Sequence, residues 1–159
     1  MLPTCQKYGM GVIVWSPLAG GWLTGRYRKD ADIDMTTGRA RRLPHRFDPS
    51  LPGNQGKLAA VEELIKVAAD AGCSLTHLAL AFVTTHPGVT SAIIGPRTMD
   101  QLTDLLAGAS VTLDDAVLDR IDQIVPPGVT LNPADAGWQP TVLADPAARR
   151  RPQATRAAS

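Results

Sequence analysis

Two short apolar runs, set far apart in the chain, limit the folds that this sequence can adopt. Residues 12–15 read Val-Ile-Val-Trp and stop at Ser16-Pro17, and residues 92–94 read Ala-Ile-Ile and stop at Gly95-Pro96. Runs of this length and composition are typical of buried strands. The interval between them has helical patterns, and crossovers of that length favour parallel pairing and hence an α/β protein. Because two strands cannot complete a sheet that is apolar on both faces, we expect the chain to be part of a larger sheet.

Helical periodicity and capping residues account for most of the remaining chain. Ser74 and Thr98 are expected N-caps, Thr98 forming a capping box with Gln101, and either Asp114 or Thr112 caps the last helix. Residues 20–56 are polar and rich in Gly and Pro, with no surviving period, so we predict a long loop there. Besides a short helix before the first strand, the predicted helices cover residues 57–71, 74–86, 98–108 and 114–124.

Composition describes one globular unit with a distinct C-terminal end. The chain has 159 residues, 44% of them hydrophobic, a formal charge of +1, and two cysteines without C-x-x-C spacing. These values favour a single domain in a reducing, cytoplasmic setting, and they give no reason to expect nucleic acid or a membrane as a partner. We predict a folded unit over residues 1–125 and a disordered Pro/Ala/Arg-rich tail over residues 126–159.

The tail has an alternative interpretation as a nucleic-acid arm. It carries four arginines within eight residues, Arg149, Arg150, Arg151 and Arg156. An arm this short neutralises few phosphates, so its binding would be weak and sensitive to salt. The disordered tail is therefore the preferred interpretation.

The second apolar run leads into a pattern that suits an anion. Gly95-Pro96-Arg97-Thr98 combines a close-approach glycine, free backbone N–H groups, a positive helix end and a guanidinium group. In parallel α/β proteins ligands bind at the carboxyl ends of the strands, where this segment lies. The alternative is that Arg97 is a solvated surface charge and Gly95 only a turn, and local features leave both interpretations open.

The two runs together resemble the aldo-keto reductase family. The resemblance rests on Trp15-Ser16-Pro17-Leu18-Ala19-Gly20-Gly21, on Gly25-Arg26-Tyr27 and on the segment from Gly95 to Leu102, in that order and spacing. It extends from about Leu2 to about Ile124 and is strongest to the branch that contains potassium-channel β-subunits and bacterial oxidoreductases. It implies a partial (β/α)8 TIM barrel, made of the last two strands with their helices and an extra C-terminal helix.

The resemblance also implies which residues bind a nicotinamide dinucleotide. The turn after the first strand would hold the pyrophosphate, Trp15 would pack on the nicotinamide ring, and Arg26 and Arg39 would close a clasp over the cofactor. Arg39 has the alternative of being a solvated loop charge. An arginine at position 97 implies NADPH, although Leu105 stands where the family commonly has an asparagine that helps to hold the adenine. The implied residues are Trp15, Ser16, Pro17, Leu18, Ala19, Gly20 and Arg26, then Arg39, Gly95, Arg97, Gln101 and Asp104.

Catalytic residues are not expected in this chain, because the family's catalytic tyrosine, lysine, aspartate and histidine lie upstream of the resemblance. His45, His77 and His86 have no paired acid at readable spacing, and we interpret them as structural or solvated. Tyr8 and Tyr27 lie in the lead-in helix and the clasp loop, so neither is expected to donate a proton. No metal site is expected either.

The functional expectation is therefore a fragment of an NADPH-dependent oxidoreductase that reduces aldehydes or ketones. Met1 falls inside the lead-in helix, so we expect a truncated product, a mis-assigned start or half of a split enzyme, with little activity alone. A small carbonyl substrate is expected only for an intact parent, in a pocket with an aromatic wall near Trp15 and Trp22. The alternative is a non-catalytic NADPH-binding or scaffolding module that pairs with a separate chain carrying the missing strands.

Overall fold

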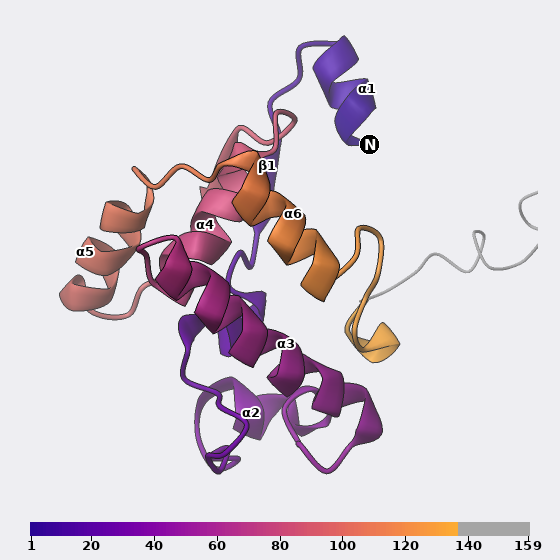
Figure 1. Ribbon diagram of the computed structural model, residues 1–159, viewed down its shortest axis with the longest axis vertical. Coiled ribbons are helices and arrows are strands. Elements are labelled where there is room, and N and C mark those ends of the chain that lie inside the picture. The colour runs from indigo at the N-terminus through magenta and orange to yellow at the C-terminus, as the bar shows by residue number, and fades with distance from the viewer. Residues whose placement is uncertain (137–159) are drawn as a thin grey trace, which may run out of the picture.

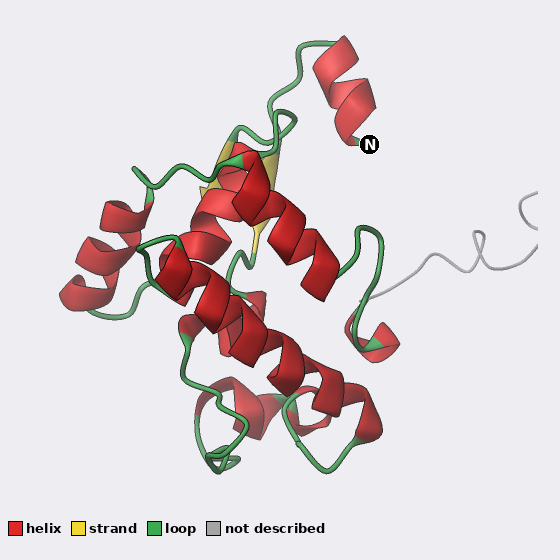
Figure 2. Cartoon of the chain, in the orientation of Figure 1, coloured by secondary structure: helices red, strands yellow, loops and turns green. Residues whose placement is uncertain are grey.

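The structure, a computed structural model that describes residues 1–136, contains one pair of parallel strands. Strand β1 (Ile13–Trp15) pairs with β2 (Ser91–Ile93), and Val14 lies opposite Ala92. The two strands form one small sheet, and helices and loops make up the rest of the described chain (Figure 2). The predicted parallel pairing is confirmed, and it places the carboxyl ends of both strands at the same edge.

Helices make up most of the described chain (Figure 1). The predicted caps form: Ser74 accepts a hydrogen bond from the backbone of His77, Thr98 from Gln101, and Asp114 from Val117. Helix α3 begins five residues earlier than predicted, because a proline is favourable in the first helical turn, where its missing N–H is not needed. The α-helices are α1 (Leu2–Lys7), α2 (Gly38–Arg42), α3 (Pro52–Asp70), α4 (Leu75–Thr85), α5 (Met99–Gly108) and α6 (Asp115–Ile124).

The predicted long loop contains short helices that the sequence pattern does not indicate. They are η1 (Ala19–Thr24), α2 and η2 (Pro44–Arg46), each six residues or fewer. Segments this short contain at most two turns, too few for a hydrophobic period to be recognised. The prediction of a structureless loop over residues 20–56 is therefore wrong.

The core lies where α3 packs against α4 and α6 and where the η1 turn meets α3 and α4. Buried aliphatic side chains of α3, such as Val61 and Val67, contact Leu78 of α4 and Ile121 of α6. Three aromatic rings, Trp22, Tyr27 and Phe47, extend this core under η1. In Figure 1 α3 and α6 run side by side, while α1 stands apart at the N-terminus.

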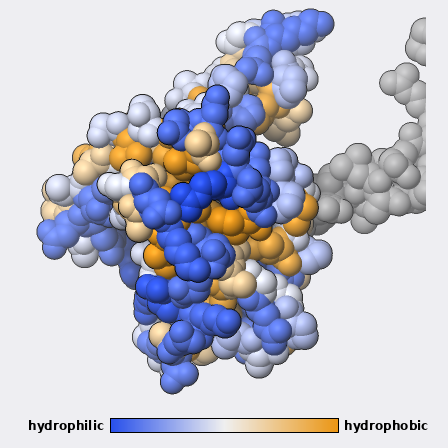
Figure 3. All heavy atoms as spheres, in the orientation of Figure 1, coloured by the Kyte–Doolittle hydropathy of each residue, from blue (hydrophilic) through white to orange (hydrophobic). Residues whose placement is uncertain are grey.

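One face of the sheet is uncovered in the described chain, contrary to the expected burial on both faces. Ile13, Trp15 and Ile93 are 67%, 80% and 57% exposed, whereas Val14 and Ala92 on the other face are half-buried. Helix α4 packs on the sheet, but no element within residues 1–136 covers the opposite face. On the side of the molecule where α3 and α6 lie in front of the strands, apolar residues reach the surface between polar ones (Figure 3).

Beyond the expected domain boundary at residue 126 the described chain is mostly exposed, and Asn132 is its one buried residue up to residue 136. Residues 126–136 include η3 (Pro133–Asp135), and Asn132 is buried against the start of α3. Two polar side chains of this segment are bonded to α3: Asn132 donates to Asn54, and Asp135 forms an ion pair with Lys57. The rest of the predicted tail, with its four arginines, lies outside the described residues.

Within residues 1–136 no single helix is long and apolar enough to cross a membrane. Helices α3 and α4 satisfy the length and composition criteria only as a pair, and the pair is bent by 86°.

Candidate functional site

A groove of about 860 Å³ opens at the carboxyl ends of β1 and β2. Its volume is in the range typical of ligand sites. The segments after β1 and after β2 line it together, because parallel strands end at the same edge. Of the twelve residues predicted from the sequence, only Ala19 does not line it. The eleven others that do are Trp15, Ser16, Pro17, Leu18, Gly20, Arg26, Arg39, Gly95, Arg97, Gln101 and Asp104.

The turn after β1 holds an unusual backbone conformation. Ser16 and Ala19 have positive φ angles of 57° and 48°, in the left-handed region that non-glycine residues rarely occupy. The turn is fixed by hydrogen bonds from Ala19 N to Ser16 O (3.0 Å) and from Gly21 N to Leu18 O (2.8 Å). Backbone strain of this kind costs about 1–3 kcal/mol per residue and is concentrated at functional sites. The turn is thus a preformed backbone wall of the groove.

The segment after β2 ends at the N-terminus of α5. Thr98 caps the helix by accepting from Gln101 N at 3.2 Å. The Gln101 side chain, however, accepts from Arg97 N (2.8 Å), so the reciprocal bond of the predicted capping box is not formed. Gln101 instead fixes the backbone on which the exposed Arg97 side chain is mounted. The free N–H groups and positive end of α5 favour a bound anion beside that guanidinium group.

Four arginines face the groove without a carboxylate partner. Within residues 1–136, neither Arg26, Arg39, Arg42 nor Arg97 forms an ion pair, although Arg28, Arg46 and Arg120 do. Guanidinium groups bind phosphate oxygens in a fixed fork geometry. The groove therefore has the charge and the donors for a ligand with several phosphates.

Arg42 is the lining arginine that sequence reasoning did not identify. It lies three residues after Arg39 on α2, a spacing that brings two side chains to one face of a helix. The signal was present in the sequence, but it could be used only if a helix had been predicted there. Arg39 itself lines the groove beside Gly20, where a Cβ atom would lie 3.7 Å from Arg39 Cδ.

His77 has an acidic partner, which the sequence spacing did not reveal. Its Nε2 lies 3.0 Å from Asp104 Oδ1 and 2.9 Å from the Asp104 carbonyl oxygen. The two residues are 27 positions apart and meet because α4 packs against α5. His77 thus has an acid partner that no readable spacing in the sequence indicates, and its imidazole ring orients one carboxylate oxygen of Asp104.

The aromatic residues divide between the groove and the core. Trp15 presents an exposed ring to the groove, and Tyr27 lines it from a buried position. Trp22 does not line the groove; it is buried against Phe47 with ring centroids 5.4 Å apart. The Trp22 ring lies beneath the turn, and the expected aromatic wall of a substrate pocket near Trp15 and Trp22 stays a prediction for an intact parent. Tyr8 ends α1 and is exposed outside the groove.

Comparison with known proteins identifies the family. Residues 1–126 match the Aldo/keto reductase family. The chain belongs to the aldo/keto reductase family. It is 34% identical over 127 residues to the uncharacterized oxidoreductase YrpG of Bacillus subtilis, covering 79% of this chain and 35% of that protein. It is also 34% identical over 129 residues to a probable voltage-gated potassium channel subunit beta of Oryza sativa, covering 78% of this chain and 38% of that protein.

The structural comparison agrees with the family. The glycerol dehydrogenase of Gluconobacter oxydans matches with a TM-score of 0.63 and 25% identity, covering 82% of this chain and 39% of the dehydrogenase. The family predicted from the sequence is therefore confirmed, together with the likeness to bacterial oxidoreductases and channel β-subunits. The chain spans between a third and two fifths of the length of these relatives.

Within residues 1–136 no three His, Cys, Asp or Glu side chains are grouped as a metal site would require.

Proposed function

We propose that the groove binds NADPH and that this chain is the cofactor-binding part of an oxidoreductase that reduces aldehydes or ketones. One observation carries the proposal: a strained turn, a helix N-terminus and four arginines that form no ion pair within residues 1–136 line a single groove. A dinucleotide with an extra phosphate matches this arrangement, because it offers separate anionic groups to separate donors. NADPH supplies a hydride when it is bound.

Each segment then has a role in binding. The backbone of the turn at residues 16–20 holds the pyrophosphate, and the exposed Trp15 ring packs on the nicotinamide. Gly95 and Arg97 take the 2′-phosphate of the adenosine, while Gln101 and Asp104 contact its ribose and adenine. Arg26 and Arg39 close over the ligand from the loop that contains α2.

The proposed architecture explains why the chain alone should have little activity. Its two strands correspond to the last two of a (β/α)8 barrel, whose active site draws residues from the ends of several strands. Within residues 1–136 we assign the proton donor to neither tyrosine: Tyr8 lies outside the groove, and Tyr27, although it lines the groove, is only 7% exposed and packs in the aromatic core. The catalytic residues and the wall that contacts a small carbonyl substrate would come from other strands.

An arginine substitution tests the proposal. Arg97→Ala should weaken NADPH binding by about 10- to 100-fold, because a charged hydrogen-bonded contact contributes about 1.5–3 kcal/mol. NADH binding should change much less, since NADH lacks the 2′-phosphate. The measurement is a fluorescence titration with each cofactor. Arg120→Ala is the matched control, because Arg120 pairs with Asp70 and does not line the groove.

Equal loss for both cofactors would contradict the assignment of Arg97 to the 2′-phosphate. Absence of any NADPH binding by the unsubstituted chain would contradict the proposed function itself. Turnover of NADPH by the purified chain with a range of aldehydes would contradict the proposal that other strands supply the catalytic residues.

A second candidate function is a non-catalytic module that pairs with a separate polypeptide. The exposed apolar face of β1 and β2 favours it, because open strands and apolar faces in soluble proteins are normally covered. Isolation of the native protein distinguishes the two. A co-purified polypeptide that carries further strands of the barrel supports pairing, and a single longer polypeptide excludes it.

A further inference from the structure

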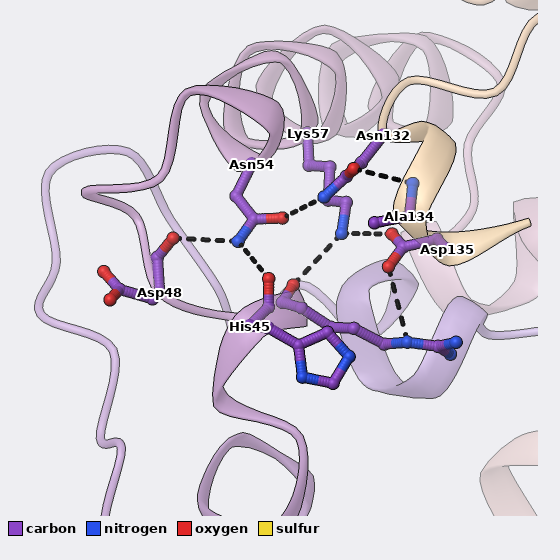
Figure 4. Close-up of polar contacts among 8 residues, drawn as sticks. His45, Asp48, Asn54, Lys57, Asn132, Ala134 and Asp135 are labelled. Carbon is purple, nitrogen blue, oxygen red and sulfur yellow. Dashed lines mark hydrogen bonds and ion pairs between the residues drawn. The ribbon is translucent and has the colours of Figure 1, made fainter.

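A buried lysine near the N-terminal end of α3 forms the centre of a polar network (Figure 4). The Lys57 side chain is only 9% exposed; its ammonium group donates to the carbonyl oxygen of Arg46 at 3.0 Å and forms an ion pair with Asp135. Asp135 also contacts Arg46 Nε at 3.4 Å. A buried ammonium group is costly unless it is paired and hydrogen-bonded, so these contacts are tightly constrained.

A pair of buried asparagines forms the second half of the network. Asn54 is fully buried, and its amide nitrogen donates to the carbonyl oxygens of His45 (3.0 Å) and Asp48 (2.8 Å). Its side-chain oxygen accepts from Asn132 Nδ2 at 2.9 Å, and Asn132 Oδ1 accepts from Ala134 N at 3.0 Å. These bonds hold both side-chain amide groups in a defined orientation.

The network ties the end of the described chain to the loop that contains η2. We call residues 129–136 the C-terminal strap. Asn132 is seated directly over Gly53, where an added Cβ atom would lie 2.9 Å from Asn132 Cγ. The strap therefore contacts the first turn of α3 closely, and it shares Lys57 and Asn54 with residues 44–48.

The same lysine also reaches the turn that forms the groove wall. Lys57 Nζ lies 5.4 Å from the centroid of the Trp22 ring, a cation–π contact. Trp22 belongs to η1 and stacks on Phe47 with an interplanar angle of 3°. Gly20, which lines the groove, approaches the same Phe47 ring: a Cβ atom there would lie 3.7 Å from Phe47 Cζ. A continuous set of contacts thus runs from the strap to the groove.

We infer that the C-terminal strap positions the groove wall, and that Asn132 and Asp135 set dinucleotide affinity without touching the ligand. None of the described residues 129–136 lines the groove, so their effect passes through Asn54, Lys57 and the aromatic rings. Without Asp135, the Lys57 ammonium group keeps only the carbonyl oxygen of Arg46 as a hydrogen-bond partner. We expect water to enter or the ammonium group to move, and either change disturbs the stacking of Trp22 on Phe47. The effect on dinucleotide affinity rests on the proposed function, whereas the positioning of the groove wall by the strap does not.

Hydrogen exchange on the full chain tests the structural step directly. Asp135→Asn and Asn132→Ala should raise amide exchange in residues 19–25 and 44–48 by about tenfold or more, because these segments lose their fixed support. Exchange in α5 should stay unchanged. Asp70→Asn is the matched control: Asp70 also lies on α3 and also has an ion-pair partner, Arg120, but on the exposed surface at the other end.

NADPH titrations test the functional step. Both strap variants should bind NADPH about tenfold more weakly than the unsubstituted chain, and Asp70→Asn should not differ from it. By reciprocity, saturating NADPH should slow exchange in the strap by a similar factor while leaving α6 unchanged. A purely structural role for the strap would not produce that selective protection.

The outcomes separate the two ideas. Unchanged exchange in residues 19–25 and 44–48 in both variants overturns the inference, whatever the NADPH result. Faster exchange there without NADPH binding by the parent chain supports the positioning role and refutes the proposed function. Faster exchange throughout α4 as well would mean that Asp135→Asn destabilises the whole fold. The same outcomes are then judged on Asn132→Ala, which leaves the ion pair between Lys57 and Asp135 in place.

Discussion

Phe47 and Phe82 are the two phenylalanines of the chain, and they offer an internally matched test of the aromatic core. Phe47 is 2% exposed and contacts the Trp22 and Tyr27 rings at centroid distances of 5.4 and 5.3 Å. Phe82 lies on α4 and is 42% exposed. The same substitution, Phe→Ala, therefore removes a ring from two very different environments.

The expected loss at Phe47 follows from its contacts. Burying a phenylalanine side chain is worth about 1.5–3 kcal/mol, and each aromatic pair adds about 0.5–1.5 kcal/mol. The sum agrees with the loss of about 3–5 kcal/mol that buried Phe→Ala substitutions produce. Phe82→Ala removes a partly exposed ring and gains helix propensity, so its loss should be about 1 kcal/mol or less.

Urea titration measures both losses as changes in the free energy of unfolding. Phe47→Ala could consume most of the stability of a domain this size, which is about 5–15 kcal/mol, so Phe47→Leu is included as a graded variant with an intermediate loss. Equal losses for Phe47→Ala and Phe82→Ala would refute the reasoning, because they would mean that the ring cluster contributes no more than an exposed ring.

Two further substitutions test local packing and charge. Gly108→Ala should lower the free energy of unfolding by about 1–3 kcal/mol, because its Cβ would lie 2.8 Å from the His77 ring. In a double-mutant cycle, His77→Ala should remove most of that cost. Additive losses in the cycle would contradict the contact. Hydrogen bonds from the Arg28 guanidinium lower the pKa of Glu62 from 4.5 to about 2, so Glu62 stabilises the fold above pH 4.5 and this contribution is lost as the pH falls towards 2. Acid titration should therefore show the unsubstituted chain losing its stability advantage over Glu62→Gln across that window, whereas a constant difference between the two proteins would contradict the low pKa.

The parts of the fold that the sequence predicted are those decided by neighbouring residues. A cap is a bond between a side chain and a backbone N–H three residues away, so Ser74, Thr98 and Asp114 could be identified locally. The site was predictable for a different reason: parallel strands bring their carboxyl ends together whatever lies between them. That rule brought residues 16 and 97 to one groove although 81 positions separate them.

The parts that could not be predicted depend on contacts between distant residues. Asn54 and Asn132 are 78 positions apart, and neither has a local feature that marks it as buried. His77 and Asp104 meet only because two helices pack against each other. The burial of Asn54 and Asn132 could not be predicted, because burying such polar groups is favourable only when a hydrogen-bond partner is in place.

At the uncovered face of the sheet, the apolar sequence predicts more burial of the strand side chains than the described chain provides. Strand residues that are apolar on both faces indicate cover on both faces, yet Ile13, Trp15 and Ile93 are mostly exposed in the described chain. Covering a side chain of this kind stabilises by about 1.5–3 kcal/mol, so any chain segment or partner that packs there gains from all three at once. The composition of β1 and β2 is thus better explained by cover over this face of the sheet than by the two strands alone.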